Sequence, residues 1–228
     1  MKKVIAIILA LCLIIIVTSF PVFASKSSSN EYYFKRNDQN KIALTFDDGP
    51  HPKQTYKILD ILEKYDIKAT FFVVGVNAEN YPEPLKEIVK RGHEIGNHTY
   101  SHKYVKGKDA KTVSADLDRC RDVIFSICGV KPTVFRAPGG LMDEISVGNS
   151  QVFSEYDIIY WSIDTMDWAH HSPEEIETQV LGNIKSGDII LMHDYIGYNS
   201  PTADALELII PKLIEKGFSF VTVSELIK

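Results

Sequence analysis

The sequence predicts an α/β fold, a distorted or incomplete (β/α) barrel with about seven parallel strands. From residue 41 to residue 228, short apolar runs alternate with amphipathic stretches, without an internal repeat or a low-complexity segment. Such alternation is typical of parallel strands joined by helical crossovers. Room for about seven repeats favours a barrel with one open or irregular side over a flat doubly wound sheet. No Gly-rich dinucleotide or phosphate loop is present.

Strands are predicted where short apolar runs are bounded by turn residues. The first run ends in Thr45 and Phe46 and is followed directly by a Gly/Pro turn, which marks a buried strand that stops abruptly. In chain order, strands are expected at 42–46, 69–74, 94–96, 134–135, 158–163, 188–192 and 218–222.

Helices are predicted where apolar residues recur every three or four positions, as Ile58, Leu59 and Leu62 do. Gly129 is expected to end one helix, and Pro173 to begin another at its first turn. In chain order, helices are expected at 53–65, 84–90, 112–127, 146–155, 173–183 and 202–216, followed by a terminal helical turn.

The first 24 residues have the pattern of a signal peptide: a basic start, an apolar stretch, and small residues suited to cleavage at 22–24. We expect a polar tether and lead-in over 25–40 and one domain over 41–228. The apolar stretch is short for a bilayer span, so a retained N-terminal anchor is the less favoured interpretation. The mature protein is therefore expected to be secreted or associated with the cell wall.

Charge and cysteine content restrict the possible partners. Removal of the signal peptide takes two of the 25 basic residues and none of the 30 acidic ones, which leaves 23 against 30, a net charge of −7. Such an acidic chain is a poor candidate for binding nucleic acid or an anionic membrane. Cys120 and Cys128 lack metal-type spacing, and on one helix they would lie roughly 12 Å apart. We expect buried thiols, with a disulfide as the alternative if the helix ends early.

The chemistry is expected at the carboxyl ends of the strands, beginning with Asp47 and Asp48. Because side chains alternate along a strand, two adjacent acids share one site only where the strand ends and the backbone turns. This favours divided roles, for instance one metal ligand and one free base. The alternative is a solvated Asp-Gly-Pro turn.

His98 and His102 follow the third predicted strand. On one helical turn, imidazoles four residues apart lie on the same face, roughly 5–6 Å from each other. With a carboxylate such as Asp48, they would form a two-His-one-carboxylate set that leaves positions open for water and substrate. A chance pair is the alternative. His170 and His171 lie in a polar loop and are interpreted as solvated residues rather than ligands.

Three further segments follow later strands. Arg136 could orient a carboxylate by a bidentate pair, and the Gly-Gly pair after it could point backbone amides at an oxyanion; a surface arginine is the alternative. Trp168 is either a core residue or a wall for stacking against a sugar. His193 stands where a buried strand emerges, a position at which a histidine is often only structural.

Taken in order, these segments resemble the motifs of the polysaccharide deacetylase family, the chitooligosaccharide deacetylase homology domain of carbohydrate esterase family 4. The resemblance covers residues 41–228, and five ordered motifs at strand ends are far more specific than any one of them. The motifs are Thr45-Phe46-Asp47-Asp48-Gly49-Pro50, His98 to His102, Arg136 to Gly140, Asp164 to Trp168 and Leu191 to His193.

The resemblance implies a divalent metal bound by Asp48, His98 and His102, most often zinc, with cobalt or another ion in some relatives. It also implies that Asp47 is the general base and is tethered by Arg136.

By the same resemblance, His193 is the general acid, supported by Asp167, while Trp168 and Leu191 line the groove and the pocket for the acetyl methyl. A backbone amide near Gly139 would contact the oxyanion. The family usually has Tyr or another large residue where Gly139 stands, so the groove lacks a wall there and its subsite preference is left open.

The expected function is N-deacetylation of N-acetylglucosamine residues in peptidoglycan or a related polymer. The enzyme is expected to be a monomer whose partner is an extracellular N-acetylated glycan. Metal-activated water would attack the amide, with Asp47 as base and His193 as acid. The alternatives are an acetylxylan O-deacetylase, an N-acetylmuramic acid deacetylase whose substrate's lactyl branch fits the gap at Gly139, and, more remotely, an inactive carbohydrate-binding wall protein.

Overall fold

The structure is a computed structural model that describes residues 31–32, 34–35, 39–142, 153–197 and 200–228. The predicted signal peptide, most of the tether and most of the helix expected at 146–155 lie outside these residues. Within the described part of the chain, no helix is both long and apolar enough to cross a membrane.

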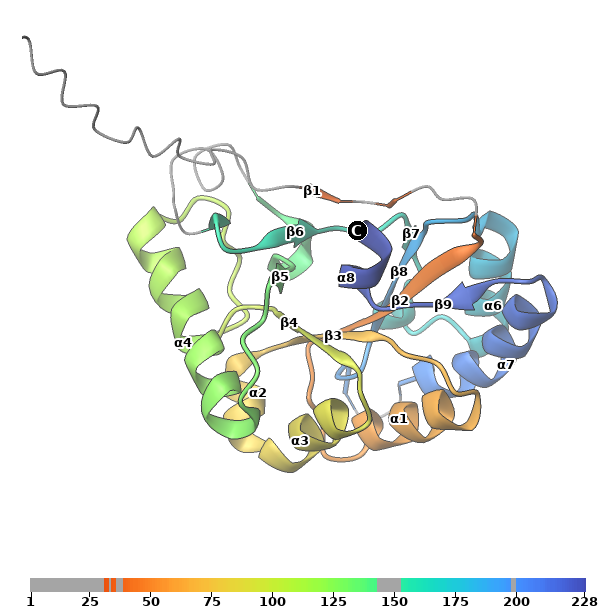
Figure 1. Ribbon diagram of the computed structural model, residues 1–228, viewed down its shortest axis with the longest axis horizontal. Coiled ribbons are helices and arrows are strands. Elements are labelled where there is room, and N and C mark those ends of the chain that lie inside the picture. The colour runs from red at the N-terminus through yellow and green to blue at the C-terminus, as the bar shows by residue number, and fades with distance from the viewer. Residues whose placement is uncertain (1–30, 33, 36–38, 143–152, 198–199) are drawn as a thin grey trace, which may run out of the picture.

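A curled sheet of parallel strands forms the centre of the molecule (Figure 1). Its main strands follow the order β6-β5-β4-β3-β2-β8-β7, and the two-residue strands β1 and β9 pair with β6 and β2. No pairing joins β7 to β1 among the described residues, so the barrel stays open on one side and the predicted fold class is confirmed. The strands are β1 (Glu31–Tyr32), β2 (Lys41–Asp47), β3 (Thr70–Val73), β4 (Glu94–Asn97), β5 (Val134–Phe135), β6 (Asp157–Ile159), β7 (Ile163–Asp164), β8 (Ile189–His193) and β9 (Ser219–Phe220).

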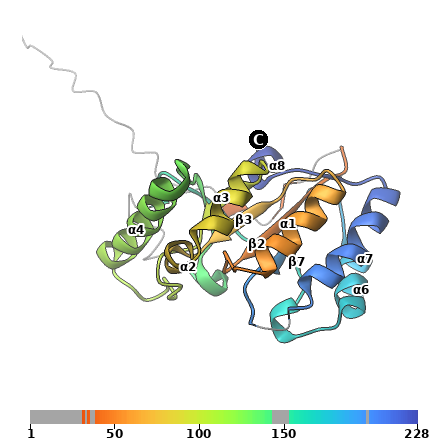
Figure 2. The same ribbon diagram turned by 90° about the horizontal axis from the view of Figure 1, so that it is seen from below.

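Most helices form an arc around the outer face of the sheet, and Figure 2 shows α3, α1 and α7 side by side along it. The terminal helix α8 instead packs with residues of the inner face. The helices are α1 (Gln54–Lys64), α2 (Gly75–Asn80), α3 (Pro82–Lys90), α4 (Ala110–Cys128), α6 (Pro173–Asn183), α7 (Thr202–Glu215) and α8 (Val223–Ile227), with short 3₁₀ helices η1 (Pro138–Gly140) and η3 (Asp167–Ala169).

Strand β2 contributes residues both to the hydrophobic core and to the inner face of the barrel. Ile42, Leu44 and Phe46 belong to the hydrophobic core that includes the helices α1 and α7, whereas Ala43 packs on the inner face with residues of α8. Because side chains alternate along a strand, Asp47 falls on the same inner face as Ala43. The last residue of the strand is thereby aimed into the barrel, at its carboxyl end.

Local sequence signals set the helix ends. The Asp109 side chain accepts a hydrogen bond from the Thr112 backbone N–H at the start of α4, and Gly129 ends that helix with a left-handed φ of 73°. The helix α6 begins with a capping box in which Ser172 and Glu175 bond each other's backbone N–H. The bounds of α6 are those predicted.

The elements differ from the predictions in two places, and one cysteine differs from its predicted burial. The strand expected at 158–163 is two strands, β6 and β7, which lie at opposite ends of the sheet order, because residues 160–162 cross from one edge to the other without a helix. The short helix α2 was not predicted, since six residues carry too little periodicity to register. Cys120 and Cys128 are both free, as expected, but only Cys120 is fully buried.

Candidate active site

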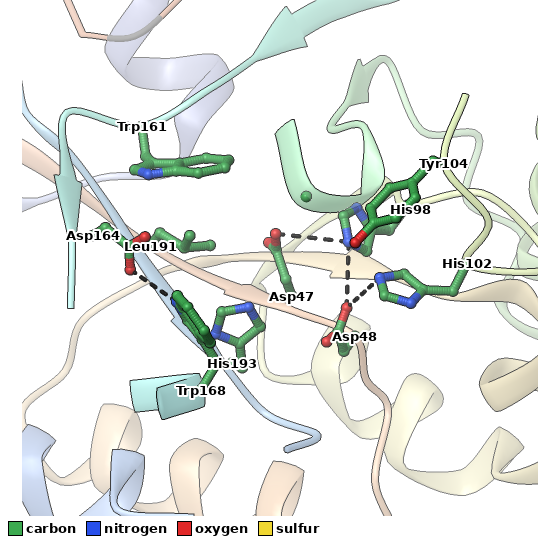
Figure 3. A pocket seen from close by; sticks show the side chains of 11 residues that line it. Asp47, Asp48, His98, His102, Tyr104, Trp161, Asp164, Trp168, Leu191 and His193 are labelled. Atoms are coloured by element: carbon green, nitrogen blue, oxygen red, sulfur yellow. Dashed lines mark hydrogen bonds and ion pairs between the residues drawn. The ribbon is translucent and has the colours of Figure 1, made fainter. Parts of the chain in front are cut away.

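A pocket of about 520 Å³ opens at the carboxyl ends of the central strands (Figure 3). Eight of the ten predicted site residues line it, while Arg136 and Asp167 are buried behind its wall. Three lining residues were not among the predicted ones: Tyr104, Trp161 and Asp164. The full lining is Asp47, Asp48, His98, His102, Tyr104, Gly139, Trp161, Asp164, Trp168, Leu191 and His193.

Asp47 and Asp48 share the pocket because the backbone turns between them. Asp47 is the last residue of β2, and Asp48 adopts a left-handed φ of 76°, a conformation that aspartate tolerates better than most residues. The Asn77 side chain from α2 donates a hydrogen bond of 2.7 Å to the Asp48 carbonyl and fixes this turn. The helix that sequence periodicity missed therefore supports the first motif.

The turn also depends on Asp194, which lies beneath it. The Asp194 backbone N–H donates to the Asp47 carbonyl, and its carboxylate accepts a hydrogen bond of 2.5 Å from Thr55. A Cβ atom on Gly49 would lie 2.1 Å from Asp194 Oδ2, so only glycine fits there. Burial raises the pKa of Asp194 to about 7, which makes this carboxyl group easy to keep neutral next to Asp48.

His98 and His102 come together through a loop and not through the helical turn that was expected. Thr99 and His102 have left-handed φ values of 67° and 53°, and the two imidazole centroids are 5.1 Å apart. The Thr99 hydroxyl accepts a hydrogen bond from the His102 backbone N–H, and the Asn97 side chain accepts one from the Thr99 N–H. These local bonds replace the helical hydrogen bonds and give a similar spacing of the rings.

Asp48, His98 and His102 form a three-ligand cluster whose ligand atoms all lie within 4.8 Å of one another. Asp48 Oδ1 is 3.3 Å from His98 Nε2 and 2.9 Å from His102 Nε2. Ligands bound roughly 2.0–2.1 Å from one tetrahedral ion lie roughly 3.3 Å apart, so this spacing suits a metal such as zinc. His98 Nδ1 donates to the Arg136 carbonyl at 2.7 Å, so Nε2, which is turned toward Asp48, is the ring nitrogen that could ligate a cation.

The electrostatics of the cluster also suit a cation. Burial would raise the pKa of Asp48, but its hydrogen bonds with His102 and His98 outweigh that effect and hold the pKa well below its ordinary value. The hydrogen bond with Asp48 raises the pKa of His102. The cluster therefore favours positive charge next to Asp48, and a divalent cation bound there would displace any proton on His102.

Arg136 holds the carboxylate of Asp47 in place. It is fully buried, and its Nη1 donates to Asp47 Oδ1 at 2.7 Å and to the Thr45 hydroxyl at 2.8 Å. The recorded contact is single, not the bidentate pair that was expected, because Nε and Nη2 donate instead to the carbonyls of Ile159 and Tyr160. Burial lowers the pKa of Arg136, and the Asp47 charge opposes that shift.

On the opposite side of the pocket, His193 is held by Asp167. His193 Nδ1 is 2.8 Å from Asp167 Oδ1, and its backbone N–H donates to Oδ2 at 2.7 Å. The Thr202 hydroxyl, at the start of α7, also donates to Oδ2 at 2.7 Å. Burial disfavours the charged imidazole, but the hydrogen bond and charge of Asp167, together with the charges of Asp47 and Asp48, raise the pKa of His193 to about 9.

The remaining walls are apolar or aromatic. Trp168 stands at the rim, half exposed, and its indole N–H donates to Asp164 Oδ1 at 3.3 Å, while Leu191 is buried at the pocket wall. The Gly140 backbone N–H donates to the Ala137 carbonyl, so this amide is not available as an oxyanion donor. The solvated interpretation of His170 and His171 agrees with their place in the structure: both lie outside the pocket, and His170 is exposed.

Some contributors carried no signal in the sequence. Thr202 appears as an ordinary residue of a helix start, and Asp116, whose carboxylate accepts two hydrogen bonds from Ser101 in the His98–His102 loop, appears as a polar residue on the face of α4. Both act through contacts between residues distant in the chain. Asp164 lay within a recognised motif, and Tyr104 only two residues after one, so their positions could have been noticed.

Comparison with known proteins agrees with the geometry. The model of the polysaccharide deacetylase family matches residues 34–153. A peptidoglycan-N-acetylglucosamine deacetylase of Bacillus cereus is 39% identical over 194 residues, covering 84% of this chain and 90% of that protein. The peptidoglycan-N-acetylmuramic acid deacetylase PdaC of Bacillus subtilis is 40% identical over 190 residues, covering 83% of this chain but 39% of that protein. A solved peptidoglycan N-acetylglucosamine deacetylase structure superposes with a TM-score of 0.82 at 36% identity, covering 86% of this chain and 92% of that one.

Proposed function

Because the chain belongs to the polysaccharide deacetylase family, we propose that it removes the acetyl group from N-acetylglucosamine residues of peptidoglycan or a closely related polymer. One observation carries the proposal: Asp47 and His193 line the same pocket as the Asp48, His98 and His102 cluster. Amide hydrolysis needs a base for the attacking water and an acid for the leaving amine. The pocket offers one of each.

We assign Asp48, His98 and His102 as ligands of a divalent cation, and we propose zinc. Bound there, the cation would polarise the acetyl carbonyl and strengthen water as a nucleophile. Asp48 supplies negative charge at the site, and the Arg136 carbonyl keeps His98 in the tautomer that can ligate.

Asp47 is the general base in this proposal. Its Oδ1 is occupied by Arg136, whereas Oδ2 lies 3.7 Å from His98 Nε2, next to the ligand cluster. Asp47 takes a proton from the water as the water oxygen bonds to the acetyl carbon. Arg136 holds the carboxylate in place and stabilises its charge before the transfer.

His193 is the general acid. With Nδ1 engaged by Asp167, the proton available to the substrate is on Nε2. The carbon–nitrogen bond breaks as this proton passes to the nitrogen, giving acetate and a free amine on the sugar. The raised pKa of His193 keeps the acid form populated at neutral pH.

The substrate assignment rests on the relatives and on the predicted export. The relative covered almost entirely by this chain is a peptidoglycan-N-acetylglucosamine deacetylase. We propose that the protein is a secreted or wall-associated monomer, with residues 1–24 removed as a signal peptide. The net negative charge of the chain disfavours a nucleic acid, and a pocket open at the strand ends suits an extended glycan.

The test is mass spectrometry of digested peptidoglycan after treatment with the metal-loaded enzyme. Loss of acetyl groups from glucosamine supports the proposal, and loss confined to muramic acid would replace it with the N-acetylmuramic acid alternative, which the similarity to PdaC favours. Acetate release from acetylxylan, with none from any N-acetyl sugar, would establish the O-deacetylase alternative. No release from any of these would leave the inactive wall protein.

A further inference from the structure

We propose that Tyr104 forms the sugar-binding wall on the metal-ligand side of the groove, in place of a side chain that Gly139 does not carry. The inference rests on the proposed function, since it names the residue that contacts the glycan at the same site.

The first observation is the close packing of Tyr104 on Gly139. A Cβ atom added to Gly139 would lie 2.8 Å from Tyr104 Cε1, closer than real Cβ contacts. Gly139 also has a left-handed φ of 64°, which disfavours other residues. The absence of a side chain at 139 therefore does not leave a gap, because the Tyr104 ring already occupies that space.

The neighbouring glycine shows the same relation to a second aromatic side chain. A Cβ atom on Gly140, whose φ is 65°, would lie 2.6 Å from the outer edge of the Trp161 indole. Two successive glycines thus let two aromatic rings, brought from other segments, close onto the backbone of η1. Both rings line the pocket.

The second observation is the exposure of the ring. Tyr104 is 60% exposed although it lines the pocket, and Trp168, also at the rim, is 51% exposed. In Figure 3, Tyr104 lies beside His98 and His102, whereas Trp161 and Trp168 lie on the far side of Asp47. Flat exposed aromatic faces on both sides of a pocket suit a ligand with flat apolar faces and a polar edge, such as a pyranose ring.

The loop around Tyr104 is anchored at both ends. His102, a candidate metal ligand, stands two residues before it, and Val105 after it is buried in the hydrophobic cluster that includes Phe135 and Phe153. A ring held between these points is positioned with little freedom, which reduces the entropy lost when a sugar binds.

Kinetics with N-acetylated glycan oligomers and zinc-loaded enzyme test the inference. Tyr104→Ala should raise KM about tenfold, the size of one aromatic contact, while kcat and zinc affinity change less than about twofold. The KM of Tyr104→Phe and of Tyr104→Trp should stay near that of the parent enzyme. The KM of Tyr104→Leu should lie between those of the parent and Tyr104→Ala. The matched control is Phe125→Ala, which removes a similarly exposed aromatic ring from α4, outside the pocket, and should leave KM unchanged.

A double-mutant cycle tests the packing on glycine. Gly139→Ala should raise KM because it displaces the Tyr104 ring, and adding it to Tyr104→Ala should have little further effect. Fully additive effects would overturn the shared wall.

The outcomes separate this inference from the proposed function. If the parent enzyme turns over and Tyr104→Ala has an unchanged KM, the inference alone is overturned. A loss of zinc affinity in Tyr104→Ala would also overturn it, because Tyr104 would then support the ligand loop instead of the sugar. No acetate release by the parent enzyme would overturn both.

Discussion

The pocket has two halves that are completed in different ways: a metal-ligand half, formed by Asp48, His98 and His102, and an acid half, formed by His193 and Asp167. In the metal-ligand half, the side chains of His102 and Asp48 are 42% and 23% exposed, and the carboxylate is shared by two imidazoles. In the acid half, Asp167 is fully buried and His193 is 12% exposed, and both Asp167 oxygens accept hydrogen bonds from protein groups. The first half is organised to receive a ligand from outside, whereas the second is completed by the fold itself. Substitutions should therefore separate metal binding from proton transfer.

The largest effect is expected in the metal-ligand half. Asp48→Ala and His98→Ala should each abolish tight zinc binding, because each removes one of the three proposed protein ligands. Asp47→Asn should keep zinc and lose about 10²- to 10⁴-fold in kcat, because it removes only the proposed base. Calorimetric zinc titration together with acetate release separates these cases. Equal loss of zinc in all three variants would contradict the division of roles.

The next effect concerns pH and the acid half. In the proposed mechanism His193 acts in its protonated form, so the rate should fall as pH rises through the pKa of His193. That pKa is raised to about 9 without metal, and a bound cation would lower it. Asp167→Asn removes the carboxylate that supports the protonated form, so the alkaline limb of the rate profile should move to lower pH. In His193→Ala the alkaline limb should change as well.

These profiles are measured by acetate release from pH 6 upward with saturating zinc, since Asp167→Asn should retain its metal. If the alkaline limb stays in place in both variants, His193 is not the acid.

A smaller effect is expected from the support of the ligand loop. Asp116 on α4 accepts hydrogen bonds of 3.2 Å and 3.1 Å from the Ser101 backbone N–H and hydroxyl, next to His102. Asp116→Ala should weaken zinc affinity about tenfold, as groups behind metal ligands commonly do. Asp118→Ala on the same helix, which pairs with Arg121 away from the loop, is the control. A similar affinity in both variants would show that α4 does not hold the loop.

The smallest effect tests whether the fold completes the acid half. Thr202→Val removes the hydrogen bond to Asp167 Oδ2 and should lower the free energy of unfolding by about 1–2 kcal/mol, with zinc affinity unchanged. Urea denaturation measures the loss, and Thr178→Val, which removes an exposed hydroxyl on α6, is the control. Equal stability of the two variants would mean that Thr202 adds nothing to the acid half.

The difference between the two halves of the pocket also explains how much of the site the sequence could predict. Asp47 and Asp48 directly follow an apolar run, and His98 and His102 follow the third predicted strand, so the pattern predicted both pairs at strand ends. The ordered motifs then predicted that the two pairs share one site. The shape of the ligand loop was not predictable, because it depends on the left-handed backbone of Thr99 and His102 rather than on residue spacing.

The acid half was predictable only in part. His193 and Asp167 lie within recognised motifs, but Thr202 reaches Asp167 across 35 residues, and no local pattern encodes that contact. The division of 158–163 into two strands was likewise hidden, because a continuous apolar run does not reveal that the chain changes sheet edge within it.

The most direct test of the account is acetate release from N-acetylated peptidoglycan by chelated protein as zinc is added back. Activity should be absent at first, rise in proportion to bound zinc and stop rising at one zinc per chain, because the pocket has one three-ligand cluster among the described residues. Asp48→Ala should stay inactive throughout, and Asp47→Asn should bind the same single zinc without recovering activity. Full acetate release by the chelated protein, or equal recovery in Asp48→Ala, would contradict the account.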